Sequence, residues 1–337
     1  MMLIWGTDGY GNTERQRIDE SLLREWSMGK HLLKVAAGGL LLLSACSDAS
    51  EAEPMMTRDR CAAQPGFIFV PAGAFITGST PAERDYGYEI SAQAIADSPE
   101  AIAAAEQGLR DRRWFEFEAD QQTTSLAAFC IQANLVTQQD YAAFVASTNH
   151  QSPGISAAEY QEQGFLVHPY ADVVPYLWQN DALPDGLGEH PVVLASYDDA
   201  LAYAEWRGQQ DGVQYRLPTA DEWEKTARGE DGRYFPWGNE WQDDATHWGQ
   251  SIPFGTSEIA RYPLSQSPYG AEDMAGNVFE FTSTLRERRG VTVSVMKGCS
   301  WDDLPGFCRA AYEHTRPTTS RHILFGFRLV LVPESLE

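Results

Sequence analysis

The chain has 337 residues, which is enough for one large domain or two small ones. Aromatic residues make up 12% of it, glycines number 28, and long helical patterns are few, so we expect a loop-rich α+β body held by aromatic packing. The formal net charge is −23, and removing residues 1–45 leaves it unchanged because they hold five acids and five bases. A body this acidic repels phosphate backbones, which argues against nucleic acid as a partner.

A segment near the N-terminus is typical of an export signal. Lys30 and Lys34 precede an apolar run at 35–43 that is too short to span a membrane as a mature helix. The run leads into Leu43-Ser44-Ala45-Cys46, which has small residues before a cysteine. This pattern indicates a bacterial lipoprotein signal, although a chance cysteine after a buried helix would have the same letters.

The signal predicts how the chain is organised and where it acts. Met28 is the natural start, so we interpret residues 1–45 as an upstream extension followed by the signal peptide. Cleavage before Cys46 and acylation of that cysteine would anchor the protein in the bacterial cell envelope, on its periplasmic or surface side, with the membrane as a partner. We expect a polar tether over residues 46–65 and one domain over residues 66–332.

Four cysteines remain once Cys46 carries lipid. An even number in an oxidising compartment favours disulfides, and four cysteines allow three pairings. Cys61 precedes the first predicted strand and Cys130 ends another, while Cys299 and Cys308 are close in the sequence. The pairs that we favour are Cys61–Cys130 and Cys299–Cys308.

The first half of the domain has two kinds of segment. The pattern predicts two short strands within 67–78, with a turn at Ala72-Gly73, and another strand at 129–131. A helix is predicted from Thr137 through Phe144, where an acid follows the threonine at capping distance. Residues 80–122 and 151–187 lack clear apolar periodicity, and we interpret both as insertions or loops, although Ile90 to Arg113 could be helical.

Two helices are predicted in the second half. One begins at Ser196 and runs through Trp206. The other has a capping box formed by Thr219 and Glu222 and ends at Gly229, which predicts a short surface helix with one buried tryptophan, Trp223. Turns and short strands are expected beyond residue 229.

Several short motifs follow one another in a definite order along the domain. They are Val70-Pro71-Ala72-Gly73-Ala74-Phe75, His190-Pro191-Val192-Val193, Arg216-Leu217-Pro218-Thr219, Pro236-Trp237-Gly238, Asp273-Met274-Ala275-Gly276-Asn277, Gly298-Cys299-Ser300-Trp301 and Gly326-Phe327-Arg328. Each is weak alone, but together they resemble the formylglycine-generating enzyme family, also called the sulfatase-modifying-factor domain. The resemblance spans 66–332 and implies a single irregular C-type-lectin-like domain with two small antiparallel sheets and few helices.

The resemblance raises the question of whether this chain has the two cysteines that bind copper in relatives. Formylglycine-generating members oxidise a cysteine of a client sulfatase with copper and dioxygen, and two thiolates hold the copper, as a soft Cu(I) ion requires. Counted from Gly298, the first of these thiolates falls on Asp303 and the second on Cys308, while Cys299 could form a relocated pair with Cys308. We expect a structural disulfide instead, which argues against authentic formylglycine generation and leaves copper or iron undecided.

A calcium site is also implied by the resemblance. Asp273 and Glu280 match positions that supply side-chain oxygens in relatives, and Gly276 and Val278 match positions that supply carbonyls. Such a set suits a hard cation. The alternative is a glycine turn with Glu280 in a buried ion pair.

The C-terminal run borders the substrate groove in relatives, and its ionisable residues are therefore of interest. They are Asp302, Asp303, His314, Arg316, Arg321 and His322. The candidates that we select for catalysis are Cys299, Asp303, Cys308, Arg316 and His322. The alternative is a structural pair of Arg321 with Asp302 and a surface location for His322.

Two functions fit these features. The first is an exported oxidative modification enzyme, dependent on a metal and dioxygen, that acts on an unidentified small-molecule or protein substrate with a thiol or phenolic group. The absence of an H-x-x-x-H-x-E motif argues against the ergothioneine-synthase branch of the family. The second is a non-catalytic surface lipoprotein that binds a ligand or protein in the lectin-like groove, with residues 302–324 as the variable part.

Overall fold

The computed structural model describes residues 55–333, which belong to one compact unit. The predicted signal and Cys46 lie outside the described residues. Within 55–333 no helix has the length and apolar character needed to cross a membrane.

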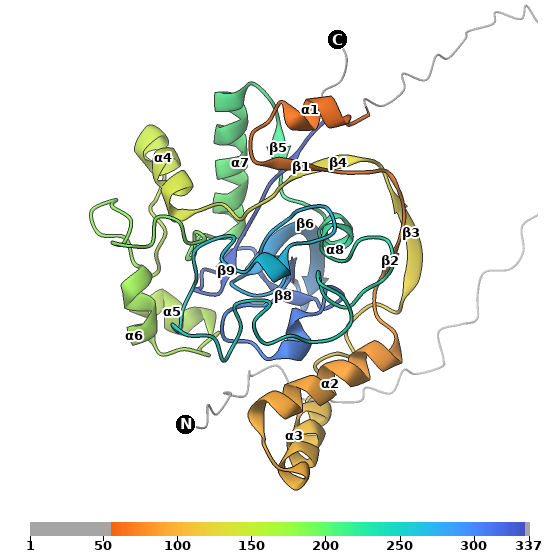
Figure 1. Cartoon of the computed structure of the whole chain (residues 1–337). Coiled ribbons are helices and arrows are strands. Elements are labelled where there is room, and N and C mark those ends of the chain that lie inside the picture. Colours follow the sequence, from red (N-terminus) through yellow and green to blue (C-terminus); the bar gives the residue numbers. More distant parts are fainter. Residues whose placement is uncertain (1–54, 334–337) are drawn as a thin grey trace, which may run out of the picture. The chain divides into compact units, whose positions relative to one another are not determined.

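Three small sheets make up the core of the fold (Figure 1). The first has the order β1-β4-β10-β5, the second pairs β2 with β3, and the third has the order β8-β7-β6-β9. The strands are β1 (Phe67–Val70), β2 (Gly73–Thr77), β3 (Gln122–Leu126), β4 (Phe129–Gln132), β5 (Tyr215–Arg216), β6 (Phe279–Arg288), β7 (Val291–Lys297), β8 (His314–Pro317), β9 (Phe325–Gly326) and β10 (Val330–Leu331). The fold class is confirmed, but the sheets number three among the described residues, and β9 runs parallel to β6.

The two strands predicted within 67–78 are both present, yet they belong to different sheets. β1 pairs with β4, where Val70 lies opposite Phe129, and β2 pairs with β3. Gly73, which begins β2, has a φ of 146°, a backbone conformation that glycine adopts at little cost. The turn therefore redirects the chain into a second sheet.

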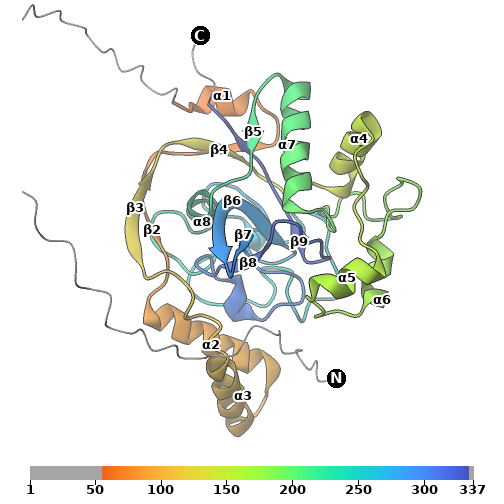
Figure 2. The same cartoon turned by 180° about the vertical axis from the view of Figure 1, so that it is seen from behind.

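Most helices lie around the sheets, whereas α8 lies among them, as Figures 1 and 2 show from opposite sides. They are α1 (Arg58–Ala62), α2 (Pro81–Ile95), α3 (Pro99–Asp111), α4 (Gln138–Thr148), α5 (Ala157–Gln163), α6 (Tyr170–Val173), α7 (Tyr197–Asp211) and α8 (Ala220–Arg228), with a 3-10 turn η4 (Pro305–Cys308). The predicted helices that begin after Thr137, Ser196 and Thr219 are confirmed, each with its capping box.

The prediction of a loop over 80–122 was wrong. Thr80 and Ser98 cap two helices, α2 and α3, and each helix has proline in its first turn. These helices form a hairpin that projects from one end of the body (Figure 1). Residues 151–187 likewise contain α5 and α6.

Helix α8 is buried rather than superficial. Trp223 is fully buried as predicted, but so are the charged side chains of Glu224 and Arg228 on the same helix. Glu224 Oε1 lies 2.9 Å from Arg228 Nη1, and its Oε2 lies 3.0 Å from Lys297 Nζ of β7. Ion pairing on both oxygens explains how this carboxylate is accommodated in the core.

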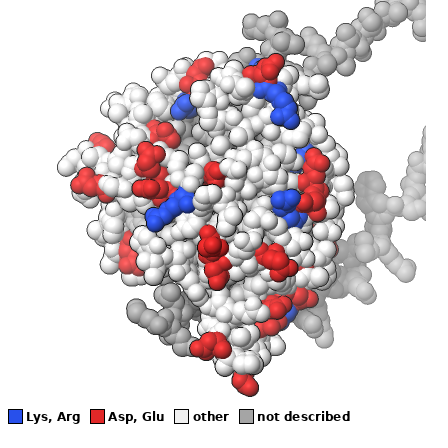
Figure 3. All heavy atoms as spheres, viewed as in Figure 1, with Lys and Arg blue, Asp and Glu red and all other residues white. Residues whose placement is uncertain are grey.

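A second buried ion pair joins distant segments of the chain. Both terminal nitrogens of the Arg309 guanidinium donate to the carboxylate of Glu118, with Nη1 3.0 Å from Oε2. Arg228 Nη2 also lies 3.3 Å from Glu83 of α2. Most acids remain at the surface, where they are spread over the face seen in Figure 3 and outnumber the basic residues there.

Both predicted disulfides are confirmed. Cys61 of α1 is bonded to Cys130 of β4, and Cys299 is bonded to Cys308 at the end of η4. The described end of the predicted tether, from residue 55, thus includes a one-turn helix tied to the first sheet. The second bond closes the loop that carries the candidate site residues.

Candidate functional site

Polar side chains from three separate segments meet beside the 299–308 loop. We call them the His322 cluster, and its members are Tyr160, His168, Asp302, Asp303 and His322. Tyr160 belongs to α5, His168 follows it in the next loop, the two aspartates follow β7, and His322 lies between β8 and β9.

His168 lies between two carboxylates. Its Nε2 is 2.8 Å from Asp302 Oδ2, and its Nδ1 is 3.5 Å from Asp172 Oδ2. The side chains of His168 and Asp302 are nearly buried, at 4% and 6% exposure, whereas that of Asp172 is 44% exposed. His168 therefore connects a buried carboxylate with one at the surface.

The hydrogen bonds of Tyr160 determine the tautomer of His322. The Tyr160 hydroxyl donates to the carbonyl oxygen of His168 at 2.9 Å and lies 2.9 Å from His322 Nε2. A hydroxyl has one proton, so Nε2 must carry the proton of this second hydrogen bond. Nδ1 of the neutral imidazole then presents a lone pair, and it has no hydrogen-bond partner among the described residues.

His322 is held in its neutral form. Its pKa is well below the ordinary value because burial removes the imidazole from water and because His168 and Arg316 add positive charge nearby. The pKa of His314 is lowered in the same way, by burial first and then by Arg316 and His322. Nε2 of His314 also has no partner within 55–333.

Asp303 occupies the position of the first copper thiolate that the resemblance implies. Ser300 donates its backbone amide to Asp303 Oδ2 at 2.8 Å, and the Ser300 hydroxyl contacts both Asp303 and Asp302. Burial, and then the charge of Asp302, raise the pKa of Asp303 well above its ordinary value. Asp303 is therefore a buried carboxyl group with a raised pKa, hydrogen-bonded within its own turn.

Aromatic rings enclose the cluster. The ring of Phe165 lies 4.7 Å from that of His322, and the guanidinium of Arg316 lies 3.5 Å from the centre of the Phe165 ring. On the opposite side of the cluster, the ring of Trp301 lies 4.9 Å from that of His168. These contacts restrict the access of water to the histidines.

Only some of the candidate residues selected from the sequence belong to the His322 cluster. Asp303 and His322 belong to the cluster, and Arg316 lies beside it, but Cys299 and Cys308 are bonded to each other and present no thiolate. The residues present therefore do not fit the thiolate copper site, because Asp303 replaces one sulfur and the disulfide removes the other.

The alternative interpretation of the C-terminal run was wrong on two points. Arg321 binds Asp199 at 2.6 Å, whereas Asp302 binds His168. His322 is fully buried, although the alternative placed it at the surface.

Most of the residues predicted to bind calcium already accept hydrogen bonds from other groups of the protein. Both carboxylate oxygens of Glu280 accept hydrogen bonds from Arg328, at 2.6 and 2.8 Å, as the alternative reading of a buried pair expected. Asp273 Oδ2 accepts from the amide of Ala260, and burial raises the pKa of Asp273 to about 6. The carbonyl of Gly276 accepts from the amide of Val278.

This arrangement does not fit a calcium ion. Both carboxylates of the predicted set already accept hydrogen bonds from protein donors, Glu280 on both of its oxygens, which leaves few oxygens free for a cation that takes about six to eight of them. No group of three or more histidine, cysteine, aspartate or glutamate side chains that could hold a metal occurs between residues 55 and 333.

Sequence reasoning missed Tyr160 and His168. Both lie in the stretch 151–187 that was predicted as an irregular loop, 162 and 134 residues from their partners His322 and Asp302. A capping box formed by Ser156 and Glu159 was the available signal for α5. No local pattern could show that this helix meets the C-terminal run.

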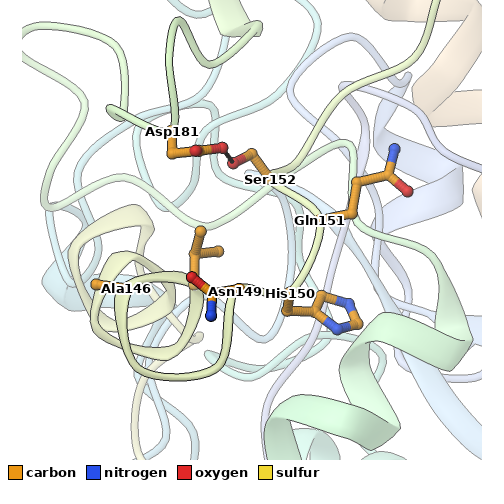
Figure 4. A pocket seen from close by; sticks show the side chains of 7 residues that line it. Ala146, Asn149, His150, Gln151, Ser152 and Asp181 are labelled. Atoms are coloured by element: carbon orange, nitrogen blue, oxygen red, sulfur yellow. Dashed lines mark hydrogen bonds between the residues drawn. The ribbon is translucent and has the colours of Figure 1, made fainter.

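Two shallow hollows lie away from the cluster. One, of about 430 Å³, is lined by residues 145, 146, 149–152 and 181. Ser152 donates to Asp181 there, but the side chains of His150 and Gln151 point away from Asp181, as Figure 4 shows. The other, of about 560 Å³, lies along α7 and β5. Neither contains a residue of the His322 cluster.

The chain is similar to known proteins over most of its length. It is 32% identical to "Inactive C-alpha-formylglycine-generating enzyme 2" of Mus musculus, over 55% of this chain and 68% of the relative. It is 28% identical to "Formylglycine-generating enzyme" of Mycobacterium tuberculosis, over 66% of this chain and 94% of the relative. It is 30% identical to "Hercynine oxygenase" of Mycolicibacterium smegmatis, over 47% of this chain and 42% of the relative.

A solved structure and a family model agree with these relatives. The structure of PvdO from Pseudomonas aeruginosa superimposes with a TM-score of 0.55 at 18% identity, covering 83% of this chain and 98% of that protein, which establishes the shared fold. The model of the sulfatase-modifying factor enzyme 1-like domain matches residues 52–332. The chain therefore belongs to the sulfatase-modifying factor enzyme 1-like domain family.

Proposed function

We propose that this chain is an exported, lipid-anchored enzyme that oxidatively modifies a small-molecule or protein substrate at the His322 cluster, with dioxygen as the electron acceptor and without the thiolate pair of formylglycine-generating members. The observation that carries the proposal is the buried lone pair of His322 Nδ1, which has no partner among the described residues. A neutral imidazole with a fixed tautomer is a ready proton acceptor.

The surroundings of His322 suit proton removal from a weakly acidic group. Nδ1 would accept the proton of an O–H, N–H or S–H group of the substrate, and a base positioned in this way accelerates a reaction by about 10²–10⁴-fold. The positive charge of Arg316 acts on His322. It would stabilise the anion that remains on the substrate.

Oxidation is supported by the relatives. The family includes proteins named as a formylglycine generator and as an oxygenase, both of which carry out oxidative chemistry. It also includes a relative named as inactive, so membership alone does not establish catalysis. The role proposed for the cluster is proton removal by His322, and the Cys299–Cys308 disulfide offers no thiolate pair for copper.

Export and anchoring rest on two observations. The residues Leu43-Ser44-Ala45-Cys46 have the form of a lipoprotein cleavage site. The disulfides Cys61–Cys130 and Cys299–Cys308 are typical of proteins that leave the reducing cytosol. Labelling with a radioactive fatty acid tests the anchor: Cys46→Ala should abolish the incorporation of label.

Dioxygen consumption tests the catalytic part of the proposal. The purified protein would be supplied with panels of phenols and thiols in an oxygen-electrode cell. We expect uptake by the natural protein, a loss of at least about 100-fold in His322→Gln, and retention in the double variant Cys299→Ser/Cys308→Ser. Thermal denaturation of each variant would establish that it is folded.

Two results would oppose the proposal in different ways. Loss of uptake in the cysteine variant, with His322→Gln active, would restore the sulfur chemistry of the family. The absence of uptake in the natural protein, together with saturable binding of a phenol or thiol, would favour the ligand-binding lipoprotein instead.

A further inference from the structure

Exposed apolar side chains lie on the segment that contains His168 and on the loop whose Phe254 ring contacts it. Of the eleven large apolar side chains that are exposed in the described part of the chain, four lie on these segments. They are Leu166, Val174, Ile252 and Phe254. Leu166 and Val174 flank His168 and Asp172 along the chain, and Ile252 and Phe254 belong to the loop opposite.

Phe254 forms the layer between solvent and the buried part of the cluster. Its ring is 4.3 Å from that of Trp301, edge to face at 83°, and 5.7 Å from that of His168. Phe254 is 55% exposed, whereas Trp301 and His168 are 2% and 4% exposed. An aromatic ring that is half in water thus covers two rings that are almost dry.

The loop that carries Phe254 is held at its ends and exposed between them. The amide of Gly249 donates to the carbonyl of Asp303 at 2.9 Å, and the carbonyl of Gly255 lies 2.6 Å from His247 Nε2. Residues 252–254 between these anchors are exposed. Rotation of the Phe254 side chain could therefore uncover His168 without loss of the anchors.

The ring of Phe254 also indicates what fits at this position. It makes the edge-to-face contact with Trp301 that aromatic pairs prefer, and a ring supplied by a ligand would gain the same contact. A polar or saturated group would not gain the edge-to-face contact.

We propose that Phe254 is the gate of the His322 cluster and that its ring occupies a subsite for an aromatic group of the ligand. The placement of a ligand at the cluster rests on the function proposed above. The gate and the subsite, however, are tested without any turnover, so their failure is distinguishable from failure of that function.

Chemical modification of His168 tests the gate. The full exported protein, and its Phe254→Ala, Phe254→Trp and Phe117→Ala variants, would be treated with diethyl pyrocarbonate, and modification of His168 would be followed by peptide mass spectrometry. Phe117 is the matched control because it is also an exposed phenylalanine, at 71%, outside this loop. Unchanged thermal denaturation would confirm that each variant is folded.

The expected result is specific to position 254. Modification of His168 should be at least fivefold faster in Phe254→Ala than in the natural protein, and unchanged in Phe117→Ala and Phe254→Trp. An equal rate in Phe254→Ala and the natural protein would overturn the gate. Equal acceleration in both alanine variants would do the same, because it would report general loosening.

A pair of probes tests the subsite. Benzyl alcohol and cyclohexylmethanol have similar size, but only the first has an aromatic ring. In Phe254→Ala, benzyl alcohol should slow the modification of His168 toward the natural rate, and cyclohexylmethanol should slow it at least threefold less. Equal protection by both alcohols, or protection by neither, would overturn the aromatic subsite.

Discussion

The protonation of individual side chains determines what the candidate site can do. Burial lowers the pKa values of His322 and His314 and raises the pKa of Asp303, so burial disfavours the charged form of all three side chains. The tautomer of His322 follows from a single hydroxyl proton on Tyr160. A neutral imidazole and a carboxyl group with a raised pKa are thereby placed in one enclosed region.

The lowered pKa of His322 predicts a dependence of stability on pH. Its imidazole is neutral in the folded protein but takes up a proton in the unfolded chain below the ordinary pKa of 6.5. Protons therefore bind preferentially to the unfolded state as the pH falls, and the His322 contribution to the free energy of unfolding is full above 6.5 and lost below it, by up to about 1.4 kcal/mol per pH unit.

Comparison with a variant isolates this contribution from that of other groups. The free energy of unfolding would be measured by denaturant titration at several values between pH 7.5 and 5 for the natural protein and for His322→Gln. The natural protein should lose stability relative to the variant as the pH is lowered. A difference that is constant, or that grows in favour of the natural protein at low pH, would show that His322 is not held neutral.

At the scale of elements, the α2–α3 hairpin is fastened to the loop that carries the site. Gly306 of η4 packs directly against the backbone of Gly87 in α2, and a Cβ at 306 would also meet Ser91 Oγ at 2.6 Å. The Ser91 hydroxyl in turn accepts a hydrogen bond from the backbone amide of Gly306, at 2.9 Å. The hairpin therefore helps to hold the turn that follows Asp302 and Asp303.

Two glycine substitutions test this contact. Gly306→Ala should destabilise the protein by about 1–3 kcal/mol, because the added methyl group must displace backbone atoms. Gly108→Ala should stabilise it by up to about 1 kcal/mol, because position 108 lies within α3 with no atom within 4 Å of the new methyl group. Chemical denaturation would measure both, and a neutral Gly306→Ala would show that the contact yields without cost.

Elements with local signals could be predicted, and those without could not. Helix α8 was predictable because Thr219, Glu222 and Gly229 mark its ends within a short stretch. Helix α2 has a cap at Thr80, but its buried face includes Glu83, Gly87 and Ser91, so apolar periodicity could not reveal it. The orders of sheets β1-β4-β10-β5 and β8-β7-β6-β9 depend on contacts far apart in sequence.

At the scale of the whole molecule, a family scaffold carries a disulfide and an aspartate at the positions that the resemblance assigns to the copper thiolates. The ordered motifs predicted the fold, and the spacing from Gly298 predicted the loss of the copper thiolates, because both are properties of the chain read in order. The partners of Asp302 and His322 were not predictable, since His168 and Tyr160 reach them only through the tertiary fold. The site is thus a product of folding more than of any motif.

The proposed function requires that Cys299 and Cys308 are bonded to each other and offer no thiolate pair. The most direct measurement is the state of Cys299 and Cys308 in the full-length protein, purified without reductant, alkylated after denaturation and mapped by mass spectrometry, with Cu(I) binding measured on the same sample. The account predicts that neither cysteine is alkylated and that no stoichiometric Cu(I) is bound. Alkylation of both cysteines, with one Cu(I) ion bound per chain, would contradict it.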